Sequence, residues 1–128
     1  MSKHEESPFK GKTGIRRLIN AFGYSLDGIK AAFRHEDAFR QLALLAIILI
    51  PTALFIVPAS PLARALLVAS SLATLVIELL NSAIEAAVDH TSLERHPLAK
   101  RAKDMGSAAQ LLGLINLAAM WSLVLFGH

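Results

Sequence analysis

Residues 65–88 read ALLVASSLATLVIELLNSAIEAAV, and this stretch decides the class of fold. It is long and apolar enough to cross a ~30 Å hydrocarbon core as a helix, which takes about 20 residues. Two further stretches, residues 42–59 and 108–126, contain no charged residue. The sequence therefore predicts an all-α membrane protein with three transmembrane helices, at about residues 38–59, 63–89 and 106–126.

The composition agrees with a membrane protein and excludes several other classes. Of the 128 residues, 54% are hydrophobic and 18% are charged, against about 45–50% and about 25% in soluble domains. The apolar excess excludes a disordered chain, and the absence of cysteine excludes a disulfide scaffold or a thiolate metal site. The net charge of +3 is too small to indicate a nucleic-acid partner, and we expect none. The length predicts a single domain, residues 1–128.

The distribution of lysine and arginine predicts the orientation in the membrane. Eight of these residues precede the uncharged stretch 42–59, four lie between residues 89 and 107, and only Arg64 lies between residues 59 and 65. By the positive-inside rule, the N-terminus and the 89–106 loop face the cytoplasm.

Residues 14–34 have the pattern of an amphipathic helix at the membrane surface. Apolar residues recur on one side of this helix at positions Ile15, Leu18, Ile19, Phe22, Leu26, Ile29 and Phe33. Basic and polar residues occupy the other side, so the helix is expected to lie in the interface with its apolar side down. The periodicity leaves two interpretations open, a plain anchor or a rim at which a lipid head group meets a soluble partner.

The second span carries an unusual polar stripe. At about 100° per residue, seven polar residues fall within a sector of about 100°; they are Ser71, Thr74, Glu78, Asn81, Ser82, Glu85 and Asp89. An acidic side chain at membrane depth costs about 2.5–3.5 kcal/mol on insertion scales. Three helices are too few to enclose the stripe on every side, so we expect a homo-oligomer. The alternative is a stripe that serves assembly alone.

Depth along the span suggests separate roles for the acidic residues. Glu85 lies about 10 Å closer to the cytoplasm than Glu78, and Glu36, just before the first span, lies at a similar depth to Glu85. Carboxylates beside an aqueous phosphate site usually hold Mg²⁺. Glu36 and Glu85 are therefore candidate Mg²⁺ ligands, and Glu78 is placed where a lipid head group can reach it.

Two motifs give a family resemblance. Residues 78–89, ELLNSAIEAAVD, and 101–109, RAKDMGSAA, strongly resemble the prokaryotic integral-membrane diacylglycerol kinases, and so do residues 23–25 and 36–41. The resemblance covers about residues 14–126. It implies a homotrimer in the bacterial cytoplasmic (inner) membrane that transfers the γ-phosphate of ATP to diacylglycerol, forming phosphatidate in phospholipid recycling.

The resemblance also implies a role for individual residues. Glu78 is similar to the family's general base, Asn81 to a residue that orients the lipid hydroxyl, and Glu36 and Glu85 to the Mg²⁺ ligands that bridge the nucleotide phosphates. Asp89 matches a polar position of the site. The remaining nucleotide-contacting positions are Arg17, Tyr24, Glu94, Arg95, His96, Lys103 and Asp104. The lipid-contacting positions are Arg17, Ala21, Phe22, Gly23, Tyr24, Ser25, Leu26, Lys30, Ala31, Ala32, Phe33, Ala38, Phe39, Arg40, Gln41, Leu42, Glu78, Ser107 and Trp121.

Two positions depart from the family pattern, and two other functions remain open. Phe22 is bulkier than the family's small residue, and Leu42 replaces a polar residue, so both bear on how acyl chains fit. One alternative is a related kinase that phosphorylates undecaprenol. The amino-acid sequence of the two long motifs favours diacylglycerol as the substrate. The other is a non-enzymatic oligomeric membrane protein.

Overall fold

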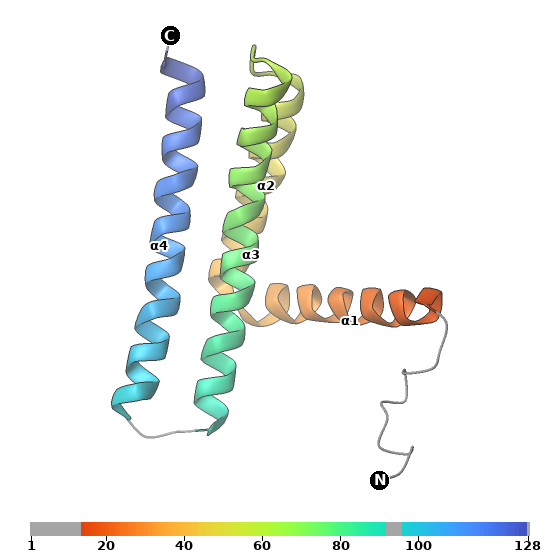
Figure 1. Ribbon diagram of the computed structural model, residues 1–128, viewed down its shortest axis with the longest axis vertical. Helices are drawn as coiled ribbons and strands as arrows, with labels where there is room; N and C mark the ends of the chain where they lie inside the picture. The colour runs from red at the N-terminus through yellow and green to blue at the C-terminus, as the bar shows by residue number, and fades with distance from the viewer. Residues whose placement is uncertain (1–13, 92–95, 128) are drawn as a thin grey trace.

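The computed structural model describes residues 14–91 and 96–127, and this part of the chain contains four helices and no strand. They are α1 (Gly14–His35), α2 (Asp37–Phe55), α3 (Pro61–Thr91) and α4 (Pro97–Phe126). The last three run side by side, whereas α1 runs across their direction and away from the bundle (Figure 1). Each of α2, α3 and α4 is long and apolar enough to cross a membrane. The predicted all-α membrane class is therefore confirmed.

The helix that contains the third span begins earlier than residue 106, at Pro97. His96 caps it, since its Nδ1 atom accepts a hydrogen bond from the backbone N–H of Leu98 at 3.1 Å. Proline at the first helical position has no N–H that would be left unpaired. These start signals lie outside the uncharged stretch, and so hydropathy alone places the beginning of the helix too late.

Arg64 organises the short connection between α2 and α3. Its Nη1 atom donates hydrogen bonds to the carbonyl oxygens of Ala53 and Leu54 at 2.8 and 2.9 Å, and its Nε atom donates to Ala59 at 3.1 Å. The last carbonyls of a helix have no partner within the helix. Arg64 supplies donors for two of them, so α2 ends at Phe55 rather than near residue 59.

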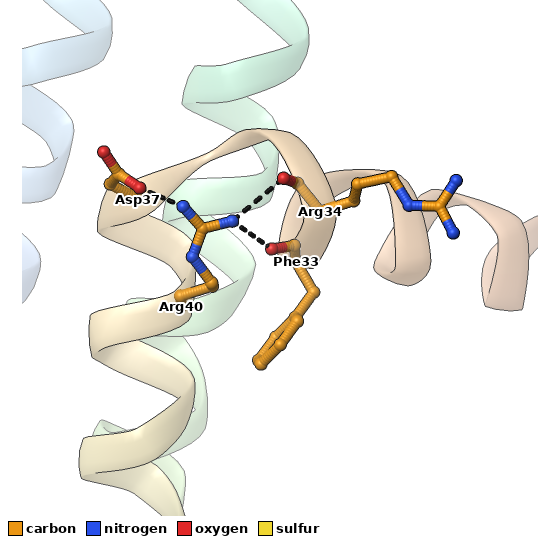
Figure 2. Close-up of polar contacts among 4 residues, drawn as sticks. All are labelled: Phe33, Arg34, Asp37 and Arg40. Carbon is orange, nitrogen blue, oxygen red and sulfur yellow. Dashed lines mark hydrogen bonds and ion pairs between the residues drawn. The ribbon is translucent and has the colours of Figure 1, made fainter.

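A second arginine joins α1 to α2 where the chain turns from α1 into the first span. The Nη1 atom of Arg40 donates to the carbonyl oxygens of Phe33 and Arg34 at 2.6 and 2.9 Å, and its Nη2 atom pairs with Asp37 (Figure 2). The guanidinium group therefore caps the C-terminal end of α1 from the second helix. This contact holds the two helices in their crossed arrangement.

Replacing Arg40 by methionine is expected to lower the free energy of unfolding by about 1–2 kcal/mol, because the carbonyls of α1 lose charge-assisted hydrogen bonds. Denaturation in mixed micelles measures this change. Arg34→Met is the matched control, since the side chain of Arg34 points away from the junction (Figure 2), and its effect is expected to stay within about 0.5 kcal/mol. Equal losses in the two variants would contradict the capping role.

The core of the bundle is small. Ala53, Val57 and Leu67 form a buried cluster near the connection between α2 and α3, and Trp121 packs against it from α4. Most large apolar residues of α2, α3 and α4 face outward. Outward-facing apolar residues suit a hydrocarbon solvent, in which they need no partner inside the chain.

The single chain encloses only part of the polar stripe. Ser71, Thr74 and Glu78 are 1%, 2% and 7% exposed. The hydroxyl groups of Ser71 and Thr74 donate to carbonyl oxygens of their own helix at 2.8 Å, so they need no external partner. The stripe becomes half-buried at Asn81, Ser82 and Glu85, and Asp89 is exposed.

Candidate active site

Glu78 lies in the contact between α3 and α4, with little of its side chain exposed. Gln110, on α4, donates a hydrogen bond from Nε2 to Glu78 Oε1 at 3.0 Å. The same nitrogen donates to the carbonyl oxygen of Thr74 at 2.9 Å. A carboxylate at membrane depth needs such a donor, because a buried polar group without a partner is costly.

Asn81 follows Glu78 by about one helical turn and is packed against α4. Its Oδ1 atom is buried without a hydrogen-bond partner in the described part of the chain, and so is Ser82 Oγ. A buried acceptor without a partner costs about 1–3 kcal/mol. Gln110 Oε1 and Trp121 Nε1 are buried in the same way, so nothing in the described part of the chain offsets this cost at the four atoms.

Gly106 lets α4 approach this part of α3. A Cβ atom added at Gly106 would contact Asn81 Oδ1 and would lie 3.2 Å from Asn81 Cγ. The Asn81 amide therefore occupies space that a side chain at position 106 would fill.

Gly106→Ala is expected to displace Asn81, to lower the free energy of unfolding by about 1–3 kcal/mol and to reduce activity. Gly28→Ala on α1 is the control, since an added Cβ there meets nothing within 4 Å, and alanine should be neutral or favourable in that helix. Thermal unfolding in detergent and rate measurements on both variants test the prediction. It is wrong if the two alanine variants behave alike.

The C-terminal end of α3 and the N-terminal end of α4 bring several predicted nucleotide residues together. Lys103 Nζ lies 3.0 Å from Asp89 Oδ1 across the two helices, and Lys100 Nζ lies 2.7 Å from Asp104 Oδ2 one turn apart on α4. Both pairs are largely exposed, so each contributes only about 0–1 kcal/mol of stability. These ion pairs group charged side chains at this end of the bundle but do not fix their conformations. His96 is exposed at the same end, as the cap of α4, and the predicted residues Glu94 and Arg95 lie outside the described residues.

The two predicted metal ligands stand on different helices. Glu36 occupies the cap position before α2, but its side chain makes no capping hydrogen bond. Glu85 is half-buried on α3, as is Glu36. No group of three His, Cys, Asp or Glu residues that could hold a metal occurs among residues 14–91 and 96–127. A metal at this site would therefore need ligands from its substrate as well as from the protein.

The predicted lipid-contacting residues are spread over a wide surface. Those on α1 are exposed except Ala32: they are Arg17, Ala21, Phe22, Gly23, Tyr24, Ser25, Leu26, Lys30, Ala31, Ala32 and Phe33. The N-terminal half of α1 lies away from α3 (Figure 1). Within one chain, the structure therefore does not bring this half of α1 next to Glu78.

The lipid-contacting residues on α2 and α4 differ in burial. Phe39 is buried, Arg40 and Leu42 are half-buried, and Ala38 and Gln41 are exposed. On α4, Ser107 is exposed near Gly106, whereas Trp121 belongs to the core cluster near the other end of the bundle. A helical rise of 1.5 Å per residue puts Trp121 about 16 Å from Gln110 along α4, so the structure does not bring it beside Glu78.

Sequence reasoning missed Gln110 as a partner of Glu78. The signal was an amide within an uncharged stretch, since a polar group at membrane depth needs a partner. The partner itself is not visible from the sequence, because Gln110 and Glu78 are 32 positions apart.

Comparisons with known proteins agree with the motifs. The model of the prokaryotic diacylglycerol kinase family matches residues 23–125. A protein of Pseudomonas aeruginosa named diacylglycerol kinase is 59% identical over 94% of this chain and 98% of its own length. Proteins of the same name from Helicobacter pylori strain 26695 and Escherichia coli K12 are 48% and 41% identical over 91% of this chain, and over 89% and 94% of their own lengths.

Proposed function

Since the chain belongs to the prokaryotic diacylglycerol kinase family, we propose that it transfers the γ-phosphate of ATP to the hydroxyl group of diacylglycerol and forms phosphatidate, in phospholipid recycling. Membership of the family makes the chain a kinase, and its three apolar helices make it a multi-pass membrane protein. The observation that carries the proposal is a carboxylate, Glu78, held inside the bundle by a hydrogen bond from a facing helix.

Glu78 is the general base in this proposal. It accepts the proton of the lipid hydroxyl as the hydroxyl oxygen attacks the γ-phosphorus, and the bond from that phosphorus to the oxygen bridging to the β-phosphate breaks, releasing ADP. Such transfer depends mainly on positioning and charge stabilisation. Asn81, half-buried one turn after Glu78 on the same helix, would help to orient the attacking hydroxyl.

Glu36 and Glu85 would hold Mg²⁺ together with the nucleotide. Mg²⁺ is usually bound by one or two carboxylates plus phosphate oxygens and waters, so two half-buried carboxylates are enough protein ligands for it. When bound, the ion would neutralise charge on the phosphates of ATP. Lys103 and Asp104 would contact the same nucleotide from the end of α4, with Arg17, Tyr24, Glu94, Arg95 and His96 completing the nucleotide site.

The lipid would reach Glu78 from the membrane interface. The apolar side of α1 is exposed, with Ile15, Phe22 and Phe33 45–71% accessible, which suits a helix lying on the acyl-chain boundary. The lipid-contacting residues of α1 and the start of α2 would then line the rim where the diacylglycerol head group enters.

A homotrimer is the proposed assembly, with the active site shared between subunits. Two observations support it: the polar residues Asn81, Ser82 and Glu85, which the single chain leaves only half-buried, and the separation of the N-terminal half of α1 from α3 of its own chain (Figure 1). The alanine face of α3, at Ala65, Ala69, Ala83 and Ala87, is exposed in the single chain and has the small residues that allow close helix packing.

The proposed location is the bacterial cytoplasmic membrane, with the N-terminus and residues 89–106 in the cytoplasm. The excess of lysine and arginine on this side supports that orientation. It places Glu36, Glu85 and Lys103 on the side of the membrane where ATP is available.

The experiment that tests the function is transfer of radiolabelled γ-phosphate from MgATP to a panel of lipids by the purified protein in mixed micelles. Diacylglycerol is expected to be the preferred acceptor, with labelled phosphatidate as the product. A strong preference for undecaprenol would show that the protein is a kinase whose substrate is undecaprenol rather than diacylglycerol. No labelling of any lipid would favour the non-enzymatic alternative.

A further inference from the structure

Gln110 places a neutral hydrogen-bond donor against the carboxylate of Glu78 in the middle of the bundle. Gln110 is 8% exposed, and it lies within the uncharged stretch of α4. Burying an amide in such surroundings is unfavourable unless its hydrogen bonds are made. The amide nitrogen of Gln110 donates two hydrogen bonds to α3, one of them to Glu78 itself, whereas its Oε1 is buried without a partner in the described part of the chain.

The surroundings determine which way the amide of Gln110 faces. Nε2 lies 2.9 Å from Thr74 O and 3.0 Å from Glu78 Oε1, and both of these atoms are acceptors. The reversed amide would put an oxygen against two oxygens and lose both bonds. Gln110 therefore uses its two N–H groups on a fixed backbone atom and on the carboxylate, which ties the carboxylate to the α3 backbone.

Gly113 allows Gln110 to take this position. An added Cβ at Gly113 would come within 2.9 Å of Gln110 Oε1 and 2.7 Å of Ile77 Cδ1. The amide thus lies between Thr74, Glu78 and the bare backbone of Gly113, with little freedom to change its side-chain conformation.

We propose that Gln110 is a positioning residue for the transfer reaction: it holds Oε1 of Glu78, so that Oε2 is the oxygen that receives the proton of the lipid hydroxyl. This inference rests on the proposed function of Glu78. A neutral donor orients a carboxylate and leaves its charge available, whereas lysine or arginine would compensate that charge with an ion pair. The effect of Gln110 is therefore on the rate of the chemical step rather than on substrate binding.

The decisive variant is Gln110→Met, which keeps the length of the side chain and removes both donors. We expect kcat to fall about 10- to 100-fold, as for a small misplacement of a reacting group, with KM for MgATP and diacylglycerol changed less than about two-fold. Asn116→Leu is the matched control, since it removes an exposed amide from the same helix, and its kcat is expected to stay near that of the parent. A parent-like kcat in Gln110→Met overturns the proposal, as does a loss accompanied by an equal rise in either KM.

Two further variants separate positioning from packing and cover the case in which Gln110→Met does not fold. Gln110→Glu keeps the shape but places a carboxyl against Oε1, and two carboxyl groups at that distance share a proton, so kcat is expected to fall at least as far. The exchange variant Glu78→Gln/Gln110→Glu keeps one amide and one carboxyl in contact. It is expected to unfold at the parent temperature and to remain inactive, whereas recovered activity would contradict the proposal.

The parent protein and Glu78→Gln show which of the two ideas fails. If the parent labels no lipid, or if Glu78→Gln keeps full activity, the proposed function of Glu78 and the role of Gln110 are both wrong. If the parent is active, Glu78→Gln is inactive and Gln110→Met has normal kcat, only the role of Gln110 is wrong.

Discussion

Glu78→Gln is expected to reduce phosphatidate formation by about 10²- to 10⁴-fold, the range over which a general base contributes, while the protein stays folded. The substitution removes the proton-accepting carboxylate and keeps the shape of the side chain. Its amide oxygen can still accept the hydrogen bond that Gln110 donates to this position. The rate with saturating MgATP and diacylglycerol measures the loss, and thermal unfolding of the same preparation shows that packing is retained.

Asp27→Asn is the control for Glu78→Gln, because it removes an exposed carboxylate from α1. Its rate is expected to stay close to that of the parent. If Glu78→Gln forms phosphatidate at a rate like that of Asp27→Asn, Glu78 does not act as the base, and the proton must leave by another route.

Glu36→Gln and Glu85→Gln are each expected to raise the Mg²⁺ concentration for half-maximal rate by about 10-fold or more. Even residues that only support a metal ligand change affinity by about 10- to 100-fold when replaced. Each glutamine keeps an oxygen ligand but loses the negative charge that attracts the cation. Titration with Mg²⁺ at a fixed ATP concentration measures the change, and high Mg²⁺ should restore part of the rate.

Asp37→Asn is the control for Glu36→Gln, because Asp37 is the neighbouring carboxylate and is paired with Arg40 (Figure 2). Its Mg²⁺ requirement is expected to match that of the parent. An unchanged Mg²⁺ requirement in Glu85→Gln would argue against metal binding at Glu85. The same result in Glu36→Gln would argue against Glu36 and Glu85 binding one Mg²⁺ together.

The membrane class could be predicted because it depends on local composition. Uncharged stretches such as 42–59 and 108–126 must become helices in hydrocarbon, since each backbone polar group then finds its partner within the same segment. The amphipathic helix could also be predicted from the sequence, because its apolar residues recur with the helical period. The helix ends were harder to predict from hydropathy. The α4 helix begins at Pro97, where His96 caps it, and α2 ends at Phe55, where Arg64 donates hydrogen bonds to its last carbonyls.

The candidate site was predicted only in part. The polar stripe identified Glu78, Asn81 and Glu85 as candidate site residues but did not identify the residues that contact them. A helical period shows which residues share a face, but not what covers that face. The structure supplies Gln110 and Gly106 from α4, and it encloses Ser71, Thr74 and Glu78 within one chain. The placing of α1 could not be predicted from its own pattern, because the junction depends on the contacts of Arg40 with the end of α1.

By itself, the sequence determined the three spans, the surface helix and the acidic residues at membrane depth. These follow from hydropathy and period, which act over neighbouring residues of one helix. Only the tertiary structure decided that Glu78 meets Gln110, because that contact depends on the rotation and axial offset of α3 against α4. Close packing at two glycines sets that arrangement, with Gly106 against Asn81 and Gly113 against Ile77.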